Sequence, residues 1–545
     1  MAQPAGAARS PRGHAREARD AAREQRAERS AARAQAGQRA EAGARRGRQD
    51  LPHGRTRRHE IRRAGARLNA GPDTTPRVGV RRGRPLSGSF APPGDKSITH
   101  RALLFGALAG GTTRVSGANA GEDCARTAAA AAALGAQVVR TSDGWTITGT
   151  AGALRAPATE LYCGNSGTTL RLIAGPVAAR PLDVVLTGDG SLSRRPMRRI
   201  AEPLVMMGAT VEGQGESCTP PLRVRGTKLR AIDYVLPMAS AQVAGCTLLA
   251  GLAAEGVTRV TLPGPARDHS ERMLPAFGIA LDCEALEHGG RRVSVRGGQT
   301  LVAADVRVPG DFSGAAFLLA AAACEPGSQV TARGVNLNPT RTAFLEVLAE
   351  MGADVRVESE RIETGEPVGD VTVRGPARLR AFDVPAAWLP RMIDEAPAWA
   401  IVAAAAHGTS RLSGASELRV KESDRIASLA AGLAVVGIEA EERPDGLAVT
   451  GGVARGGGRI ATRHDHRVAM AFAVLGARLD RPLAFDDLSS VPTSYPAFFE
   501  TLAALGADIV ADAPADRAPA DRGPADHSEH SDRGGVRGPE RSEGF

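Results

Sequence analysis

The sequence predicts an α/β protein made of six similar subdomains, on the basis of one repeated phrase and its spacing. A large apolar residue, a glycine and then small or apolar residues occur together six times, at Gly135, Gly208, Gly278, Gly352, Gly437 and Gly506. Successive glycines lie 73, 70, 74, 85 and 69 residues apart. A period of about 70 residues is longer than that of a thin solenoid, so each unit is expected to be a complete subdomain.

Each phrase predicts the end of a helix followed by a strand. Ala and Leu recur at helical spacing before the phrases, and a glycine suits the left-handed position that commonly ends a helix. A short run of strand-forming residues follows, as Gln137-Val138-Val139 follows Gly135. Helices and strands are therefore expected to alternate along the chain.

Length and composition indicate a globular body with two unusual ends. The 545 residues are a soft indication of two to four domains, and a hydrophobic content of 42% is enough for real cores. Residues 1–67 hold 18 Arg against seven acidic residues, so the leader accounts for the net charge of +9. The leader, residues 1–78, and the tail, residues 512–545, are predicted to be disordered because neither has the apolar side chains for a core.

Three interpretations of the leader remain open. The first is a solvated tail or an over-long gene start, the second is an arm that binds nucleic acid or another acidic partner, and the third is an organelle transit peptide. The seven acidic residues argue against a transit peptide. The absence of aromatic residues removes the stacking platform that single-stranded nucleic acid would use, so nucleic acid is not the expected partner.

The cysteines and the hydropathy pattern favour a cytoplasmic protein. The six cysteines are scattered, with no Cys-x-x-Cys, which fits free thiols in a reducing compartment better than disulfides or structural zinc. There is no run of 18 apolar residues and no apolar segment near the start, so neither a membrane span nor a signal peptide is expected. No metal and no cofactor are predicted.

Residues 418–426, Leu-Arg-Val-Lys-Glu-Ser-Asp-Arg-Ile, predict the start of a helix. Apolar residues recur behind them at helical spacing, at Ile426, Leu429, Ala430 and Leu433. The helix is expected to begin near Ser423, with Ser423 or Asp424 as its N-cap. A solvated charged helix start is the alternative interpretation of this stretch.

The cations of this stretch favour an anion site. Lys421 and Arg425, four residues apart, are expected on one face at a helix N-terminus, where free N–H groups attract anions. Glu422 lies between them and would need desolvation to hold a proton. Only three of the 69 basic residues are lysines, so Lys421 and Lys96 mark positions where a compact ammonium group is wanted.

Four other stretches have a similar character. They are Pro-Gly-Asp-Lys-Ser at 93–97 with Arg101 on the following helix, Gly-Asn-Ser-Gly-Thr at 164–168, Ser-Arg-Arg-Pro-Met at 193–197 and Arg-His-Asp-His-Arg at 463–467. Ser97 is the expected cap of the first helix. His464 and His466 are two apart, a poor metal pair on a helix, and are expected at the surface or behind the ligand-binding residues. Together the stretches predict a site for two highly anionic small molecules, with Asp394 and Glu422 available for proton transfer.

Eight motifs in order resemble the family of EPSP synthases, the 3-phosphoshikimate 1-carboxyvinyltransferases. Besides the stretches above they include Ala239-Ser-Ala-Gln-Val243, Arg267-Asp-His-Ser-Glu271 and Ile393-Asp394-Glu395. The resemblance covers about 83–511 and implies a two-domain inside-out α/β barrel of six βαβαββ units, with substrates in the cleft. By analogy residues 96–307 form one domain, and residues 83–95 with 308–511 form the other.

The resemblance also implies the reaction and the residues that carry it. An enolpyruvyl group moves from phosphoenolpyruvate to the 5-hydroxyl of shikimate 3-phosphate, releasing phosphate, in the shikimate pathway to chorismate and aromatic amino acids. The positions that match the contacts to shikimate 3-phosphate are Lys96, Ser97, Arg101, Ser240, Gln242, Arg267, Asp394 and Lys421. Those that match the contacts to phosphoenolpyruvate are Lys96, Gly167, Arg195, Gln242, Arg425 and Arg467. Asp394 is placed to take the hydroxyl proton and Glu422 to protonate the methylene carbon, with Lys96 beside them.

The chain departs from the better-known branch of the family at several positions. Pro492-Thr-Ser-Tyr-Pro496 lacks that branch's lysine, Ala241 replaces a hydroxyl, and Arg267 stands where that branch has a serine. These features resemble the more divergent branch, where a bulkier residue at the position of Gly167 can confer glyphosate tolerance. Gly167 leaves that space open, and we expect sensitivity to glyphosate.

Two rival functions stay open. UDP-N-acetylglucosamine enolpyruvyl transferase shares the fold and the enolpyruvyl donor. It has Lys-Asn where this chain has Lys96-Ser97, and it uses a loop cysteine as an acid, for which this chain has no counterpart. The second rival is an inactive anion-binding paralogue, against which intact Asp394, Glu422 and Lys421 argue. The expected protein is a monomer.

Overall fold

The structure is a computed structural model that describes residues 78–510. The leader and the tail expected from the sequence lie outside the described residues, apart from Val78.

One strand order occurs in six separate sheets of the described chain. In five of them a parallel pair of strands continues into two antiparallel neighbours. The remaining sheet, β18–β20–β19, has three strands, and an isolated parallel bridge between Arg380 and His407 stands where the fourth would be. With the helices between them the units follow the βαβαββ order, so the predicted six-fold repeat is confirmed.

The bounds of the first three units follow. The first holds β14 (Val306–Arg307), β3 (Thr112–Ser116), β5 (Gly144–Thr148) and β4 (Gln137–Arg140), with α3 (Lys96–Leu108) and α4 (Glu122–Ala133). The second holds β6 (Leu161–Tyr162), β7 (Asp183–Thr187), β9 (Thr219–Arg225) and β8 (Thr210–Gln214), with α5 (Gly167–Ala178) and α6 (Arg198–Met207). The third holds β10 (Asp233–Val235), β11 (Val257–Leu262), β13 (Arg291–Arg296) and β12 (Leu281–Ala285), with α7 (Ala241–Gly251), α8 (His269–Met273) and the 3₁₀ turn η2 (Leu274–Phe277).

The other three units have these bounds. The fourth holds β2 (Ser87–Phe90), β15 (Gln329–Asn336), β17 (Glu366–Arg374) and β16 (Asp354–Glu363), with α9 (Phe312–Ala323) and α10 (Ala343–Glu350). The fifth holds β18 (Thr409–Leu412), β20 (Gly446–Thr450) and β19 (Glu439–Arg443), with α11 (Ala396–Ala405) and α12 (Arg425–Val435). The sixth holds β21 (Arg459–Ile460), β22 (Leu483–Phe485), β1 (Gly79–Arg81) and β23 (Asp508–Val510), with α13 (His466–Gly476) and α14 (Phe498–Leu505). Further 3₁₀ turns are η1 (Leu192–Arg194), η3 (Glu287–Gly289), η4 (Leu389–Arg391), η5 (Ile393–Glu395), η6 (Ser416–Val420) and η7 (Val491–Thr493).

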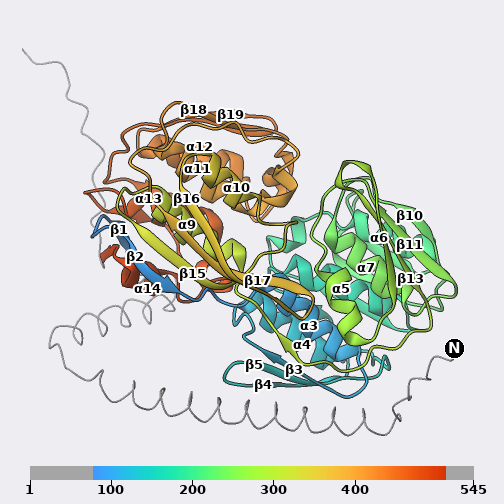
Figure 1. Cartoon of the computed structure of the whole chain (residues 1–545). Coiled ribbons are helices and arrows are strands. Elements are labelled where there is room, and N and C mark those ends of the chain that lie inside the picture. The colour runs from blue at the N-terminus through green and yellow to red at the C-terminus, as the bar shows by residue number, and fades with distance from the viewer. Residues whose placement is uncertain (1–77, 511–545) are drawn as a thin grey trace, which may run out of the picture. The chain divides into compact units, whose positions relative to one another are not determined.

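The six predicted glycines all adopt the left-handed conformation, with φ between 74° and 138°. Each follows a helix or 3₁₀ turn and precedes the strand at one end of its sheet, as Gly208 ends α6 before β8. A side chain at such φ is strained, which explains why glycine recurs there. The longest interval, 85 residues, contains the extended β16–β17 hairpin (Figure 1).

Three strands join sheets whose other strands lie far along the chain: β1, which pairs with β22 and β23, and the strands β2 and β14. β2 pairs with β15 and β14 pairs with β3, so the chain crosses between units after β2 and again after β14. The crossing segments are hydrogen-bonded to each other: Asp95 N donates to Pro309 O and Asp311 N donates to Pro93 O, both at 2.7 Å. Each segment leads directly into a helix, α3 or α9.

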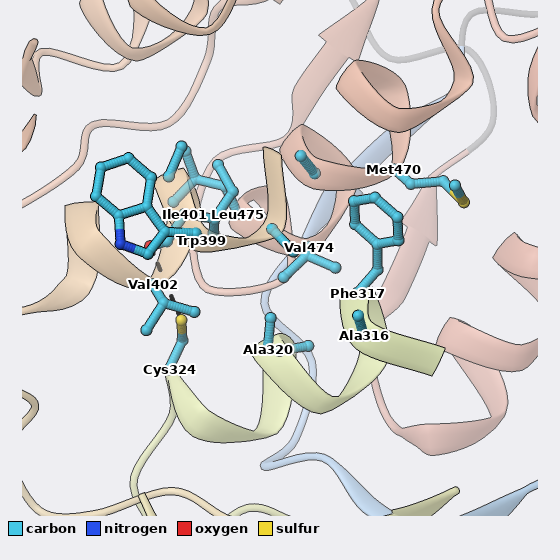
Figure 2. Packing of buried hydrophobic residues seen from close by; sticks show 14 of the residues in the cluster. Ala316, Phe317, Ala320, Cys324, Trp399, Ile401, Val402, Met470, Val474 and Leu475 are labelled. Atoms are coloured by element: carbon cyan, nitrogen blue, oxygen red, sulfur yellow. Dashed lines mark hydrogen bonds between the residues drawn. The ribbon is translucent and has the colours of Figure 1, made fainter. Parts of the chain in front are cut away.

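Buried apolar residues form two clusters. The first core contains side chains from residues 98–308, and the second contains side chains from 78–90 and 312–507. In the second core the alanine-rich helices α9, α11 and α13 pack against one another, with Phe317 near Met470 on one side of Figure 2 and Trp399 near Val402 on the other. The Cys324 thiol donates to the carbonyl of Ile401 (Figure 2). Small alanine side chains let these helices approach closely.

The described helices are all too short or too polar to cross a bilayer. All six cysteines, each of which lies among the described residues, are free thiols.

Candidate active site

The predicted helix start near Ser423 is confirmed, and its cap is Asp424. The Asp424 side chain accepts from Ala427 N at 3.0 Å, and α12 begins at Arg425. Lys421 lies outside this helix, at the end of η6, and its Nζ donates to Glu417 Oε1 at 2.8 Å. The prediction that Lys421 and Arg425 share a helix face is therefore wrong, because Lys421 has a non-helical backbone between η6 and α12.

Arg425 is fully buried and surrounded by three carboxylates. Its Nε lies 2.8 Å from Asp465 Oδ2 and its Nη2 lies 2.6 Å from Glu422 Oε2. Its Nη1 is 3.7 Å from Asp394 Oδ1 and has no hydrogen-bond partner within the described residues. Asp465 also caps α13 by accepting from Arg467 N at 2.9 Å, so one carboxylate fixes the starts of α12 and α13 together.

The first residues of α3 form a second cationic start. Asp95 caps the helix by accepting from Ile98 N at 2.9 Å, so the expected cap at Ser97 is wrong; Ser97 lies inside the first turn. Lys96 Nζ pairs with Asp123 Oδ2 at 2.8 Å. Burial would lower the pKa of Lys96, but Asp123, with a further contribution from Glu422, raises it above its usual value. Lys96 therefore stays an ammonium group.

Arg101 lies one turn further along α3, behind Lys96 and Ser97. Its guanidinium donates to the carbonyl of Ser97 at 3.0 Å and to Ser270 Oγ at 2.8 Å. The side chain is 3% exposed, and burial lowers its pKa from the ordinary value for arginine. A buried guanidinium that has only neutral hydrogen-bond acceptors, with carboxylates further away, is suited to receive an anion.

Glycine at 167 lets two guanidinium groups approach the start of α5. A Cβ at this position would lie 2.9 Å from Arg171 Nη1 and 3.4 Å from Arg195 Nη1. Asn165 holds Arg195, whose Nη2 donates to Asn165 Oδ1 at 2.5 Å. Burial, reinforced by nearby guanidinium groups including Arg195, lowers the pKa of Arg171 to about 9. Clustered cations of this kind favour an anion between them.

Gln242 joins this start to that of α7. Its Oε1 accepts from Arg171 Nη1 at 2.7 Å and its Nε2 donates to Thr168 Oγ1 at 2.9 Å. Ser240 is the N-cap of α7, with its hydroxyl 3.5 Å from Val243 N.

Asp394 is the carboxylate on which further cations converge. Arg267 donates to its Oδ2, and Arg467 donates to its backbone oxygen at 2.6 Å with Nη2 3.6 Å from Oδ2. Burial would raise the pKa of Asp394, but Arg467, Arg267 and Lys421 hold it well below its usual range. Asp394 is therefore an ionised acceptor at neutral pH.

Glu422 is ionised for a similar reason. Burial would raise its pKa, but Arg425, followed by Arg195, holds it well below the usual range. The contacts and charge interactions above link the site residues predicted from the sequence, except that Ser97, Arg101 and Ser240 are placed by their positions on α3 and at the start of α7. The site lies where the starts of α3, α5, α7, α12 and α13 come together.

Several residues at the site were not assigned a role from the sequence. Asp123, Asp465 and Asn165 bind the cations. Asn165 and Asp465 lie inside motifs that the sequence shows, whereas Asp123 reaches Lys96 through the packing of α4 against α3. Arg171 could have been predicted from the sequence, because it lies four residues after Gly167 on the same predicted helix and therefore on the same face. His466 is 4% exposed rather than at the surface, and burial, with Lys96 nearby, lowers its pKa to about 4, whereas His464 is exposed and pairs with Asp487.

Within residues 78–510 no three His, Cys, Asp or Glu side chains are grouped as a metal ion would require. The arrangement instead offers ionised carboxylates for proton transfer, surrounded by cations for multiply anionic ligands.

Comparison with known proteins shows which family the chain resembles along most of its length. The family described as EPSP synthase (3-phosphoshikimate 1-carboxyvinyltransferase) matches residues 80–502. The 3-phosphoshikimate 1-carboxyvinyltransferase of Halorhodospira halophila is 48% identical over 80% of this chain and 97% of its own length. That of Methylorubrum populi is 49% identical over 79% of this chain and 96% of its own length. The solved EPSP synthase of Acinetobacter baumannii is 44% identical, with a TM-score of 0.71 over 80% of this chain and all of that one.

Proposed function

The chain belongs to the EPSP synthase family, and from this we propose that it transfers the enolpyruvyl group of phosphoenolpyruvate to the 5-hydroxyl of shikimate 3-phosphate. The observation that carries the proposal is the pair of partly buried, ionised carboxylates, Asp394 and Glu422, held among guanidinium groups from separate parts of the chain. The enzyme acts in the shikimate pathway to chorismate and aromatic amino acids.

Shikimate 3-phosphate binds near α3, α7 and the segment before α8. Its proposed contacts are Lys96, Ser97, Arg101, Ser240, Gln242, Arg267, Asp394 and Lys421. The buried guanidinium of Arg101, together with Ser97 and Ser240, provides donors for the phosphate. Arg267 and Asp394 then lie together where the reacting hydroxyl has to be placed.

Phosphoenolpyruvate binds among the remaining cations. Its proposed contacts are Lys96, Gly167, Arg195, Gln242, Arg425 and Arg467. Two observations support this assignment: Arg425 Nη1 has no hydrogen-bond partner among the described residues, and the guanidinium groups of Arg171 and Arg195 lie close against Gly167. A carboxylate and a phosphate on one small molecule need several guanidinium groups, which bind both bidentately.

The chemistry consists of an addition and an elimination. Asp394 accepts the proton of the 5-hydroxyl as its oxygen attacks C2 of phosphoenolpyruvate, and Glu422 gives a proton to C3. Glu422 then recovers a proton from C3 as the C2–O bond to phosphate breaks and the double bond re-forms. Lys96 stands beside Glu422 and stabilises the anionic intermediate.

Binding of phosphoenolpyruvate is expected to bring a proton to Glu422. The free carboxylate is held ionised by Arg425 and Arg195, and an anion that occupies these groups removes that effect and raises the Glu422 pKa. Proton uptake should therefore be largest at pH values between the lowered pKa of the free enzyme and the raised pKa of the complex, and it should decline as the pH rises past the raised pKa. Calorimetric titration in two buffers of different ionisation enthalpy measures it. Glu422→Gln should take up fewer protons, and equal uptake would contradict this role.

Gly167→Ala is expected to raise the KM for phosphoenolpyruvate by about tenfold with little change in thermal stability, because the methyl group displaces the Arg171 and Arg195 side chains. Steady-state kinetics with each substrate varied in turn measures the effect. A change confined to the KM of shikimate 3-phosphate would place Gly167 at the other substrate.

The wild-type protein, which has glycine at position 167, is proposed to be sensitive to glyphosate. Activity that survives millimolar glyphosate at a low phosphoenolpyruvate concentration would refute this.

Phosphate release tests the function. We expect release only when phosphoenolpyruvate and shikimate 3-phosphate are both present, from the full chain and at the same rate from a chain beginning at Val78. Release with UDP-N-acetylglucosamine instead would favour the rival transferase. No release with either acceptor would indicate an inactive paralogue.

The remaining proposals concern organisation. Residues 96–307 form one domain and 83–95 with 308–511 the other, a division that the two apolar cores support. The enzyme is a monomer in the cytoplasm, and it uses no metal or other cofactor.

A further inference from the structure

A short segment, residues 267–272, connects the first core to residues of the second core at several points; we call it the strap. It runs from the loop after β11 into α8. The pairs that link it to the second core are Arg267 with Asp394, Asp268 with Asn338, His269 with Glu366, and Arg272 with Gly365. The strap therefore carries one proposed substrate residue and several contacts that touch no substrate.

The contact between His269 and Glu366 is the most deeply buried of these. His269 Nδ1 lies 2.7 Å from Glu366 Oε1, and the two side chains are 0% and 1% exposed. Asn336 and Asn338 each donate to Glu366 Oε2 at 3.0 Å. Burial would raise the pKa of Glu366, but His269 and these donors lower it to about 2. Glu366 is thus a buried carboxylate with both oxygens hydrogen-bonded: Oε1 to His269 of the strap, and Oε2 to Asn336 and Asn338.

Two neighbouring contacts, at Asp268 and at Arg272, hold the strap in the position that the His269–Glu366 contact requires. Asn338 Nδ2 donates to Asp268 Oδ1 at 2.6 Å as well as to Glu366, so one amide binds the strap and its anchor. Gly365 lies against the backbone of Arg272, and a Cβ there would stand 2.4 Å from the Arg272 oxygen. This close approach requires glycine, so the chain at β17 is shaped to receive the strap.

The strap is also tied to its own core by Arg291 of β13. The Arg291 guanidinium donates to the carbonyls of Ala266 and Arg267 and to Glu271, at 2.8 to 3.0 Å. These bonds hold the strap on the first core, but none of them sets its position relative to Asp394. Ser270, inside the strap, accepts from Arg101 Nε at 2.8 Å. A shift of the strap would therefore move Arg267 and the hydroxyl that holds Arg101.

We propose that His269 and Glu366, which together we call the clasp, are positioning residues that align the strap, and with it Arg267 and Arg101, for binding shikimate 3-phosphate. The inference rests on the proposed function. Neither side chain touches the substrates. The pair acts by fixing Arg267 of one core against Asp394 of the other, and it leaves Arg195 and Arg425, which hold phosphoenolpyruvate, in place.

The test compares His269→Leu with His269→Asn by steady-state kinetics. Leucine removes the donor to Glu366, and we expect the KM for shikimate 3-phosphate to rise about tenfold while the KM for phosphoenolpyruvate changes less than about twofold. Asparagine places its amide N–H close to the position of Nδ1, and we expect it to restore most of the affinity. Val402→Ala, in the second core away from the strap, is the control for destabilisation and should leave both KM values unchanged.

The outcomes are distinct. Unchanged KM values in an active, folded His269→Leu protein would overturn the clasp alone. Equal rises in both KM values, or the same pattern in Val402→Ala, would show a general structural effect and overturn it also. If His269→Leu fails to fold, Glu366→Gln replaces it, because a glutamine amide cannot accept from His269 and from both asparagines. A rise confined to the KM for shikimate 3-phosphate that exceeds the Val402→Ala effect then supports the clasp, and unchanged KM values in Glu366→Gln reject it. Absence of activity in wild type would overturn the proposed function and the clasp with it.

Discussion

Replacing Glu422 by glutamine is expected to lower kcat by about 10²- to 10⁴-fold, the usual range for loss of a general acid–base group. Glutamine has nearly the same shape and still accepts from Arg425, but it cannot deliver a proton to C3 or recover it. The loss should appear in kcat rather than in either KM, because the substrate-binding cations remain. Phosphate release at saturating concentrations of both substrates measures it.

Glu442→Gln is the matched control for this variant. Glu442 is an exposed carboxylate on β19 that pairs with Arg419, close in sequence to the site but outside it. We expect wild-type kcat from the control. A near-wild-type kcat in Glu422→Gln would remove Glu422 from the chemistry and leave the protonation of C3 without a donor.

Replacing Arg341 by methionine is expected to destabilise the protein by about 3–5 kcal/mol, the usual cost of removing one partner from a buried ion pair. Arg341 is 2% exposed and donates to Asp95, to Asp311 Oδ1 at 2.9 Å and to Ser313 Oγ at 2.9 Å. Methionine fills most of the volume but leaves Asp95 and Asp311 as buried charges without a partner. The midpoint of urea unfolding measures the loss.

The pH dependence of this loss identifies its cause. Burial would raise the pKa of Asp311, but Arg341, the largest of the opposing charges, holds it below the usual value. A lowered carboxylate pKa stabilises the fold above the unfolded-state pKa, and this contribution disappears as the pH falls. The difference between wild type and Arg341→Met should therefore shrink towards acidic pH. Arg356→Met, which removes an exposed partner of Asp354, should leave the midpoint unchanged, and a pH-independent loss would point to packing instead.

The repeat was predictable because its signal is local. A left-handed residue at the end of a helix requires glycine whatever the rest of the chain does, and all six predicted glycines adopt that conformation. The uneven interval of 85 residues could not be explained from the sequence, because the β16–β17 hairpin that lengthens it has no distinct signal.

The site was predictable residue by residue but not in its local geometry. Asp95 and Ser97 are both good cap residues, and the choice of Asp95 is favoured by Arg341, which lies 246 positions away in the chain. Lys421 was expected on the same face as Arg425, but the apolar periodicity does not show that a 3₁₀ turn ends just before Lys421. Asp123 reaches Lys96 only through the packing of α4 against α3, which no pattern in the sequence indicates.

The most direct test of the account is a crystal structure of Glu422→Gln, which should turn over slowly, grown with shikimate 3-phosphate and phosphoenolpyruvate. We predict both ligands among the starts of α3, α5, α7, α12 and α13, with the enolpyruvyl phosphate or carboxylate on Arg195, Arg425 and Arg467 and the 5-hydroxyl against Asp394. Ligands bound elsewhere, or a phosphoenolpyruvate that touches none of these three guanidinium groups, would contradict it.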